Sequence, residues 1–296
     1  MEALLLMGGF GTPRKTMRVY STTGLSKMIH LQSLSLRPFL DSDGDDFPFT
    51  VPVIKSLSEI QFKSPVTFLV GENGSGKSTV MEALACAVES ITVGSESVKT
   101  DKTLAPIRRL AKYFKLAWTK RTRKGFFMRA EDFFGYAHSM RATREELEEE
   151  LKNVDRDYQG RSKLAQDLAR SAYSGQLAAM KNRYGEKDLD SYSHGEAFLN
   201  LFQSRFVPGG LYLLDEPEAA LSPSRQLSFL VALKQMVEKE AQFIIATHSP
   251  IILAFPNAQI LQFHEGVVRE VKYNELEHVN LTRDFLANPE AFLRHL

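Results

Sequence analysis

A glycine-rich loop with fixed spacing constrains this chain more than any other feature. Gly71-Glu-Asn-Gly-Ser-Gly-Lys-Ser78 matches the pattern G-x-x-x-x-G-K-[ST] at every fixed position. The apolar run 66–70 before the loop is typical of a strand buried on both faces, and apolar residues recur behind it at helical spacing. A strand, a glycine loop and a helix therefore follow one another, which predicts an α/β fold with an anion site at the helix N-terminus.

The residue types of this loop suit a nucleoside triphosphate. Glycines allow backbone N–H groups to turn toward an anion, and the helix N-terminus adds partial positive charge. We expect Lys77 to reach the β- and γ-phosphates, Ser78 to ligate Mg²⁺ and Thr79 to brace the loop. The sequence thus predicts ATP and Mg²⁺ as ligands, with these candidate nucleotide contacts: Gly71, Glu72, Asn73, Gly74, Ser75, Gly76, Lys77, Ser78 and Thr79.

A second signal is an apolar run that ends in two adjacent carboxylates, Leu211-Tyr-Leu-Leu-Asp-Glu-Pro217. Carboxylates at the end of a buried strand are costly unless a cation or hydrogen-bond donors compensate them. Mg²⁺ bound to ATP supplies such a partner for Asp215. Glu216 is then the candidate general base, which polarises the attacking water.

Further segments resemble motifs of the ABC-type ATPase superfamily, and they occur in the order that this superfamily uses. The glycine loop is similar to its Walker A motif, and the run ending at Glu216 to its Walker B motif. In the signature-like segment, His194 replaces the first glycine and Glu196 stands where glutamine is usual. The other matching segments are Ser191-Tyr-Ser-His-Gly-Glu196 for the signature, Ala220-Leu-Ser222 for the D-loop and Thr247-His-Ser-Pro250 for the switch-histidine loop.

The likeness is closer to the SMC, RecF and OLD-like branch of that superfamily, and to small bacterial AAA/ABC-type ATPases. It implies a head-to-tail dimer in which the ATP bound by one protomer is capped by Ser193 and Gly195 of the other. It also implies that His248 senses the γ-phosphate. Glu131 is the candidate for the Q-loop position near Mg²⁺, with an ordinary loop carboxylate as the alternative. The likeness to the SMC, RecF and OLD-like branch rests on Glu216 to Pro223 and Ala246 to Pro250. The likeness to the small bacterial ATPases rests on Pro65 to Ser78, Gly125 to Phe134 and Ser193 to Phe198.

The expected fold is a P-loop ATPase of ABC type, with a mixed central sheet flanked by helices. We predict a poorly ordered extension over 1–27 and an ATPase domain over 28–296, in which a helical subdomain at about 99–190 separates Walker A from the signature. Alternating apolar residues over 29–36, 47–54 and 57–62 predict an N-terminal antiparallel β part. Residues 243–246 resemble another buried strand.

Two helical signals are more local. Ser222 followed by Pro223 indicates a helix start, and a largely apolar stripe of that helix is predicted at Leu227, Leu230, Val231, Lys234 and Val237. Thr143-Arg-Glu-Glu146 resembles a capping box and predicts another helix start.

Charge is unevenly distributed although the net charge is only +1. The segment Lys102 to Arg129 holds ten basic residues and no acidic one, and an acidic run follows at 145–150. This asymmetry indicates either a nucleic-acid contact surface or two solvated helix faces that neutralise one another. Tyr113, Phe114 and Trp118 lie within the basic segment as base-stacking groups or as core residues.

The sequence constrains the cellular compartment and the biological function less than it constrains the fold. One cysteine, Cys86, excludes an intramolecular disulfide, and no apolar run is long enough to cross a bilayer. We therefore expect a cytoplasmic ATPase that switches a nucleic-acid or protein partner, with DNA maintenance or phage defence as suitable settings. The alternatives are the ATPase subunit of a membrane transporter and an ATP-binding adaptor with little turnover.

Overall fold

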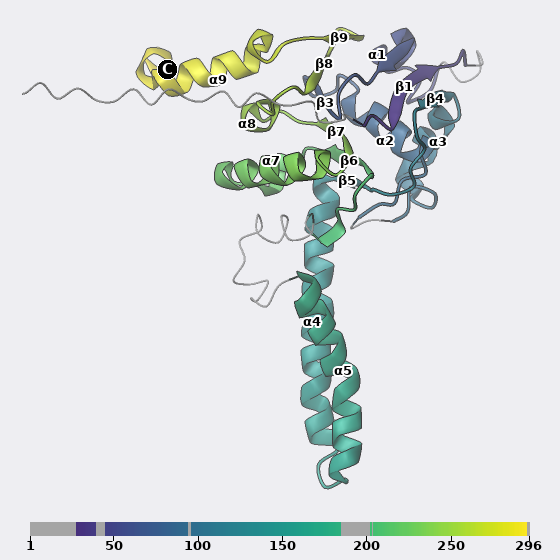
Figure 1. Ribbon diagram of the computed structural model, residues 1–296, viewed down its shortest axis with the longest axis vertical. Coiled ribbons are helices and arrows are strands. Elements are labelled where there is room, and N and C mark those ends of the chain that lie inside the picture. Colours follow the sequence, from purple (N-terminus) through teal and green to yellow (C-terminus); the bar gives the residue numbers. More distant parts are fainter. Residues whose placement is uncertain (1–27, 40–44, 94–95, 185–201, 203, 295–296) are drawn as a thin grey trace, which may run out of the picture.

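The computed structural model describes residues 28–39, 45–93, 96–184, 202 and 204–294. The predicted extension over 1–27 and the signature-like segment 191–196 lie outside these residues. A six-stranded sheet with the order β5-β6-β7-β3-β8-β9 forms the centre of the molecule (Figure 1). Its strands are β3 (Val66–Gly71), β5 (Phe127–Arg129), β6 (Leu211–Asp215), β7 (Gln242–Ala246), β8 (Gln259–His264) and β9 (Val267–Glu270).

Neighbouring strands of this sheet run parallel except for β9, which pairs antiparallel with β8. The predicted mixed sheet is therefore confirmed, as are the buried strands at 66–70, 211–214 and 243–246. Burial on both faces explains why these strands are continuous apolar runs. Leu69, Leu213 and Ile244 belong to one core cluster, whereas their neighbours Phe68 and Ile245 belong to the other.

A smaller antiparallel sheet, with the order β2-β1-β4, confirms the predicted N-terminal β part. It consists of β1 (Leu31–Leu36), β2 (Glu59–Gln61) and β4 (Phe114–Trp118). The prediction of a strand over 47–54 is wrong, because this segment forms a turn and then helix α1 (Pro52–Ser56). Proline fixes φ at a helical value and needs no N–H donor in the first turn, so Pro52 starts a helix rather than a strand.

Helices cover both faces of the central sheet (Figure 1). On one face lie α2 (Lys77–Ala87), α3 (Ala105–Ala111) and the small sheet; on the other lie α7 (Pro223–Val237), α8 (Pro250–Leu253) and the start of α9 (Glu277–Ala287), which α10 (Pro289–Leu293) follows. Cys86 is half-buried in α2, and burial raises the pKa of its thiol to about 11, so the thiol is unreactive near neutral pH.

Helix α7 begins at Pro223 as expected, but its predicted apolar stripe is only partly right, because Leu230 and Val237 pack against the core whereas Leu227, Val231 and Lys234 are exposed. Phe229, Leu233 and Met236 are buried against the sheet. Leu227 and Val231 are each 57% exposed. Helical spacing defines several overlapping stripes on so apolar a helix, and only the position of the sheet selects among them.

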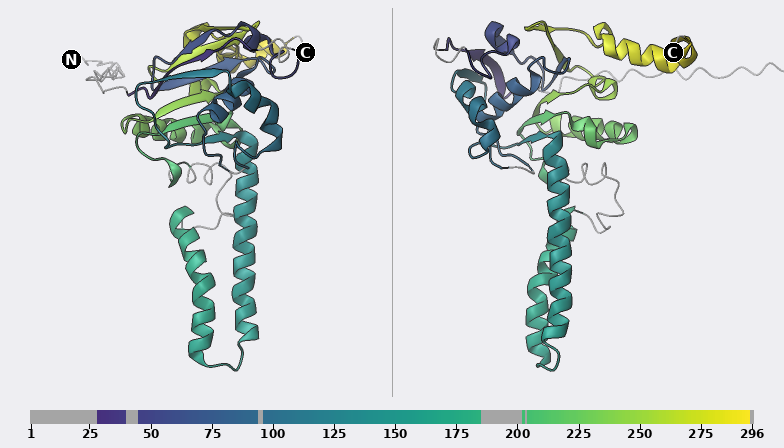
Figure 2. Two further views of the ribbon diagram at one scale, coloured as in Figure 1. Left: turned by 90° about the vertical axis from the view of Figure 1, so that its right-hand side faces the viewer. Right: turned by 180° about the vertical axis from the view of Figure 1, so that it is seen from behind.

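A helical hairpin projects from the layered part of the molecule (Figures 1 and 2). It consists of α4 (Ala130–Asp157) and α5 (Lys163–Tyr184), with Leu147, Val154 and Leu177 buried. The capping-box prediction at 143–146 is wrong, because these residues lie in the middle of α4. No helix in the described part of the chain is long and apolar enough to span a membrane.

Candidate functional site

The glycine loop connects β3 to α2 at the carboxyl edge of the parallel strands. Gly76 has φ of 95°, and a Cβ atom there would meet Val53 Cγ1 at 2.5 Å, so only glycine fits this position. Glu72, Asn73 and Gly74 are exposed, Ser75 and Thr79 are half-buried, and Ser78 is exposed in the first turn of α2. The loop therefore presents its backbone to solvent at the N-terminal end of a helix, where an anion is stabilised.

Lys77 folds back over this loop. Its side chain is almost completely buried, and Nζ donates hydrogen bonds to the carbonyl oxygens of Gly71 (2.6 Å) and Glu72 (2.9 Å). Burial lowers the pKa of Lys77, and the nearby carboxylates of Asp215, Glu216 and Glu218 oppose that change. The ammonium group thus lies inside the loop, at a place where phosphate oxygens would replace backbone carbonyls as its partners.

The strand register brings the acidic residues to the same edge. Asp215 pairs with Ala246 across β6 and β7, and Ala246 pairs with Leu69 across β7 and β3. Asp215 is 7% exposed. Glu216 adopts a left-handed backbone with φ of 50°, and its carboxylate is 47% exposed beyond the end of the strand. Two adjacent carboxylates therefore differ sharply in their surroundings, as separate metal-binding and proton-accepting roles require.

Asp215 has an unusually basic carboxylate. Burial raises its pKa to about 6, a hydrogen bond from Ser78 opposes this change, and the charges of Glu216 and Glu82 add to it. One of its oxygens, Oδ1, is buried with no hydrogen-bond partner among the described residues. A divalent cation at this point would complete the environment that the carboxylate lacks.

We expect Asp215→Asn to stabilise the nucleotide-free protein above pH 6. Because the folded pKa is raised, the native state binds a proton more tightly than the unfolded chain, so stability falls as pH rises from about 4 to about 6. A rise from 3.8 to about 6 corresponds to a penalty of about 3 kcal/mol at most. Urea unfolding without Mg²⁺ should show that gain at pH 7.5 and lose it near pH 4; an equal gain at both values would contradict the argument.

The loop after β7 carries His248 toward the carboxylates. The backbone N–H of His248 donates to Glu218 Oε1 at 2.6 Å, and His248 Nε2 lies 3.8 Å from Glu216 Oε1. On the other side, the ring of His278 from α9 lies 6.5 Å from the His248 ring, centroid to centroid. Burial lowers the pKa of His278, with the His248 charge adding to the effect, so its neutral form is favoured.

Two of these residues are absent from the candidates that the sequence offered. Glu218 lies only three positions after Asp215, and a third carboxylate so close to a buried strand end was the available signal. His278 lies far along the chain in an amphipathic helix and carries no motif.

Glu218→Ala should lower the turnover number about tenfold while ATP affinity changes little, because the switch loop loses the acceptor that fixes the His248 backbone. Glu218→Gln keeps an oxygen acceptor at that place and should lose much less. Steady-state hydrolysis of ATP by both variants separates these expectations, and equal losses in the two would show that the charge of Glu218, rather than its acceptor, is what matters.

The structure does not place the remaining candidate residues beside the glycine loop. Glu131 has a side chain that is 74% exposed and pairs with Arg129 at 3.3 Å. Ser193 and Gly195 lie outside the described residues. Phe49 is completely buried and packs on Phe39 and Tyr113, so its ring is not available to stack on adenine.

Arg129 joins the base of the hairpin to the helix that follows the glycine loop. Its guanidinium lies 3.3 Å from Glu82 of α2, 3.4 Å from Asp101 and 3.2 Å from Asp132 of α4. Its side chain is only 15% exposed, so solvent screens these pairs weakly. Arg129 belongs to this internal network and not to the open basic surface.

Five buried side-chain polar atoms in the described residues have no hydrogen-bond partner, and they all surround the glycine loop or the His248 loop. They are Ser75 Oγ, Asp215 Oδ1, Glu218 Oε2, His248 Nε2 and His278 Nε2. Buried polar atoms are normally paired, so such a cluster indicates a place where a polar ligand binds. Hydroxyl, carboxylate and imidazole groups around a glycine cradle fit a triphosphate with its cation.

Comparison with known proteins agrees with this geometry. A family profile described as "AAA domain" matches residues 53–205, more than half of the 296-residue chain, and a second AAA-domain profile matches 197–254. The macrolide export ATP-binding/permease protein MacB of Salmonella typhimurium is 25% identical over 220 residues, which are 74% of this chain. The chain spans only about a third of that relative, 31% of its length.

Solved structures with a similar course of the chain include the Smc head domain of Pyrococcus furiosus bound to the C-terminal domain of ScpA. That match has 12% identity and a TM-score of 0.44, and covers 86% of this chain and 99% of the other. The ATP-binding cassette MJ1267 of an ABC transporter matches with 16% identity and a TM-score of 0.41, covering 88% of this chain and 96% of the other.

The first profile covers the glycine loop between β3 and α2, and the second covers the carboxylates at the end of β6 and the loop that carries His248. The chain therefore belongs to the AAA-domain family, with an α/β fold in which a mixed central sheet carries the glycine loop between β3 and α2.

Proposed function

We propose that this chain binds and hydrolyses ATP with Mg²⁺ and works as an ATP-dependent head-to-tail dimer that switches a nucleic-acid or protein partner. The observation that carries the proposal is the set of five unpartnered buried polar atoms around the glycine loop. A structural loop would leave no reason for so many unsatisfied groups in one place. A triphosphate would supply acceptors for Ser75 and His248, and its cation would compensate the carboxylates.

Each residue at this edge has a role in the proposed reaction. The backbone N–H groups of the loop and the Lys77 ammonium bind phosphate oxygens, and Ser78 and Asp215 hold the cation. Mg²⁺ supplies neutralisation of the charge that develops on the transferred phosphoryl group. Glu216 then accepts a proton from the attacking water, because it is the carboxylate that reaches beyond the strand end.

His248 and Glu218 complete this arrangement. Glu218 holds the backbone of the switch loop, so the His248 imidazole is aimed at the same space as Glu216. In that position Nε2 can form a hydrogen bond to a γ-phosphate oxygen. The loop therefore changes its hydrogen bonding when the γ-phosphate leaves, which is how hydrolysis would reach the rest of the fold.

The dimer is the part of the proposal that depends on the second copy. Ser193 and Gly195 would cap the triphosphate bound by the partner, so neither protomer would have a complete site alone. The cassette MJ0796, 17% identical with a TM-score of 0.40 over 82% of this chain and 98% of its own, is described as dimeric with ADP and phosphate bound. We also propose the cytoplasm as its compartment, since its only cysteine is a free thiol.

Size-exclusion chromatography with light scattering, with and without ATP, tests the dimer. The wild type and Glu216→Gln should shift to twice the monomer mass with ATP. Ser193→Arg should still bind ATP, measured by calorimetry, yet remain monomeric. A Ser193→Arg protein that dimerises as well as the wild type would contradict the shared site.

The name of the MacB relative favours a second candidate, a cassette that serves a membrane permease. Co-purification of the native protein with a polytopic membrane protein would support that candidate against the nucleic-acid or protein switch. An ATP-binding adaptor is distinguished by turnover: hydrolysis that is unchanged in Glu216→Gln would support the adaptor.

A further inference from the structure

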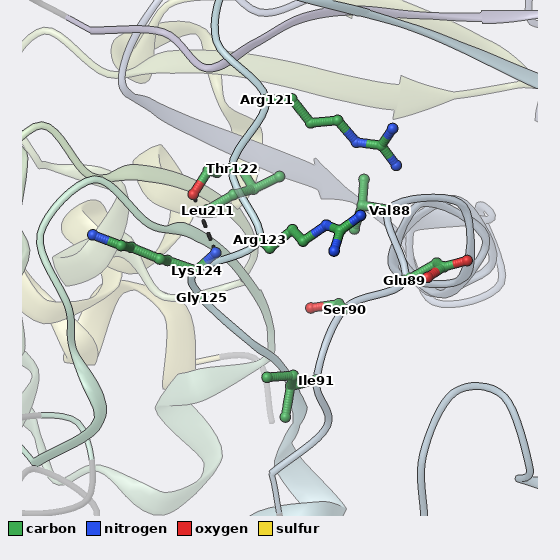
Figure 3. Close-up of a pocket in the computed structure, with 10 residues that line it drawn as sticks. All are labelled: Val88, Glu89, Ser90, Ile91, Arg121, Thr122, Arg123, Lys124, Gly125 and Leu211. Carbon is green, nitrogen blue, oxygen red and sulfur yellow. Dashed lines mark hydrogen bonds between the residues drawn. The ribbon is translucent and has the colours of Figure 1, made fainter.

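A cationic pocket lies at the end of α2 that is opposite to the glycine loop. Its walls are the segment 88–91 that follows α2, the segment 121–125 that leads into β5, and Leu211 at the start of β6 (Figure 3). The cavity measures about 270 Å³. We propose that this pocket binds the phosphate backbone of a nucleic acid; the inference rests on the proposed function only in assigning the chain a nucleic-acid partner.

The backbone of the basic wall is fixed by neutral groups. A ring nitrogen of His30 lies 3.3 Å from the Lys120 carbonyl oxygen, and the Thr122 hydroxyl donates to Gly209 O at 2.9 Å. Lys124 N donates to the Thr122 hydroxyl at 3.1 Å, and Leu211 N donates to Lys124 O at 3.0 Å. The loop is therefore held mainly by neutral groups, and Lys124 Nζ adds one long hydrogen bond to the Pro208 carbonyl oxygen at 3.5 Å.

Gly125 explains why the loop can approach β6 so closely. Its φ is 114°, and a Cβ atom there would overlap the backbone of Leu211. The chain can turn at this point only with glycine, which places the preceding cationic residues at the mouth of the pocket.

The two arginines of the pocket keep their hydrogen-bond donors for a ligand, although their charges, after the hydrogen bond from Lys99, help to lower the pKa of Glu89. Arg121 and Arg123 are exposed and form no hydrogen bond or ion pair with any residue that the structure describes. Figure 3 shows both guanidinium groups extending toward the end of α2, on the side where Ser90 lies, whereas Lys124 extends the other way. A guanidinium presents several donors in a planar fork, which matches the oxygens of a phosphate group.

The acidic content of the pocket is already compensated. Glu89 is the one carboxylate among the lining residues, and it pairs with Lys99 at 3.0 Å. Counting Lys99 with Arg121 and Arg123, three cations lie around one carboxylate, so the local charge is 3 − 1 = +2. An excess of this size attracts a polyanion.

The exposed cations in the rest of the basic segment favour a nucleic acid over a single small anion as the ligand. Three of its ten cations are engaged in the fold: Arg108 donates to Asp101 O at 2.6 Å, Arg109 lies over the Phe49 ring, and Arg129 joins the carboxylate network. The seven exposed cations are Lys102, Lys112, Lys115, Lys120, Arg121, Arg123 and Lys124. Four of them fall within the five positions 120–124, of which 121–124 line the pocket, and an open row of this kind fits successive phosphates better than one enclosed anion.

The aromatic residues of the segment do not add base stacking. Phe114 is 7% exposed, and Tyr113 packs edge-on against Phe39 and Phe49. Trp118 is packed against the same core cluster. Contact is therefore made through phosphates alone, so binding should depend strongly on salt and little on base sequence.

Fluorescence anisotropy with labelled 30-nucleotide DNA and RNA of mixed sequence, single-stranded and duplex, tests this pocket. Arg121→Gln combined with Arg123→Gln should weaken binding at least tenfold at 100 mM salt. The slope of log K against log salt should become shallower by about 1.5, since each phosphate contact contributes about 0.7–0.9. Binding of either DNA or RNA with this behaviour supports the proposal.

The matched control removes the same charge elsewhere in the basic segment. Lys112 and Lys115 lie outside the pocket, so the double variant Lys112→Gln, Lys115→Gln should change the affinity for nucleic acid less than threefold. Arg121→Lys with Arg123→Lys keeps the charge and should be intermediate, because the bidentate geometry is lost. Thermal unfolding of all three proteins should match that of the wild type.

Three results would overturn the assignment: no nucleic-acid binding by the wild type at 50 mM salt, equal losses in the pocket and control variants, or binding of inorganic phosphate without any of the oligonucleotides. ATP hydrolysis is measured separately in the absence of nucleic acid. Normal ATP hydrolysis without nucleic-acid binding would contradict only the proposal that the pocket binds phosphates. Nucleic-acid binding without ATP hydrolysis would contradict only the proposed ATPase reaction.

Discussion

Lys77→Ala should lose at least a hundredfold in ATP affinity while the protein stays folded. The Lys77 ammonium is buried in the glycine loop with two backbone carbonyls as partners. Charge-assisted hydrogen bonds of this kind are worth about 1.5–3 kcal/mol each, so the loss of two contacts to phosphate oxygens gives about 3 kcal/mol or more. Isothermal titration calorimetry with ATP and Mg²⁺ measures the change.

Lys63→Ala is the matched control. Lys63 is also a lysine that closes a pair, with Glu270 at 2.8 Å, but its side chain is 60% exposed. Surface pairs contribute at most about 1 kcal/mol to stability, and this one does not border the glycine loop, so ATP affinity should be unchanged. If Lys77→Ala bound ATP as tightly as Lys63→Ala does, the phosphate site would have to lie elsewhere.

Glu216→Gln should bind ATP normally, lower the turnover number about 10²–10⁴-fold and accumulate as the ATP-bound dimer. A glutamine keeps the size of the side chain but cannot accept the proton of the attacking water, and general-base catalysis contributes an effect of about this size. Single-turnover hydrolysis with light scattering follows both the chemistry and the assembly.

Glu240→Gln provides a control with the same substitution and a similar backbone. Glu240 is exposed and left-handed, with φ of 61°, but it precedes β7 at the opposite edge of the sheet. Its turnover and oligomeric state should equal those of the wild type. Comparable losses in Glu240→Gln would mean that the effect comes from the αL position and not from the acid.

Strands β3, β6 and β7 at the centre of the sheet could be predicted because they are short, continuous apolar runs whose following loops carry unusual chemistry. The run 66–70 and the glycine loop left few alternatives, since only a buried strand and a helix N-terminus explain both. Asp215 and Glu216 followed from the cost of burying charge at the end of β6. Parallel strands then brought these segments to one edge.

Other elements depended on packing that the sequence does not encode locally. Leu230 and Val237 of the predicted α7 stripe pack against the core, but its other apolar members, Leu227 and Val231, are exposed, and the sheet buries Phe229 and Leu233 in their place. The Thr143 signal was overridden, because α4 already begins at Ala130, where Asp132 accepts a hydrogen bond from Arg129 N. β4 was not foreseen because it is a five-residue edge strand within a charged segment.

The site shows the same division. Lys77, Asp215 and His248 follow from motifs, because each sits at the end of a buried strand or the start of a helix. Glu218 and His278 join them through tertiary structure alone: one bonds to the backbone of a loop 30 residues away, and the other comes from a helix near the end of the chain.

The length of the helical hairpin converts a small rotation at its base into a large displacement at its far end. Its first helix has 28 residues, so it reaches about 42 Å at 1.5 Å per residue. That helix starts one residue after Arg129, whose guanidinium forms an ion pair with Glu82 of α2, the helix that follows the glycine loop. A tilt of about 5° at this root would swing the far end by about 4 Å over that length, enough to make or break a side-chain contact there. A tilt of α4 that is too small to disturb the core would thus move the far end of the hairpin far enough to change its contacts with a neighbouring molecule.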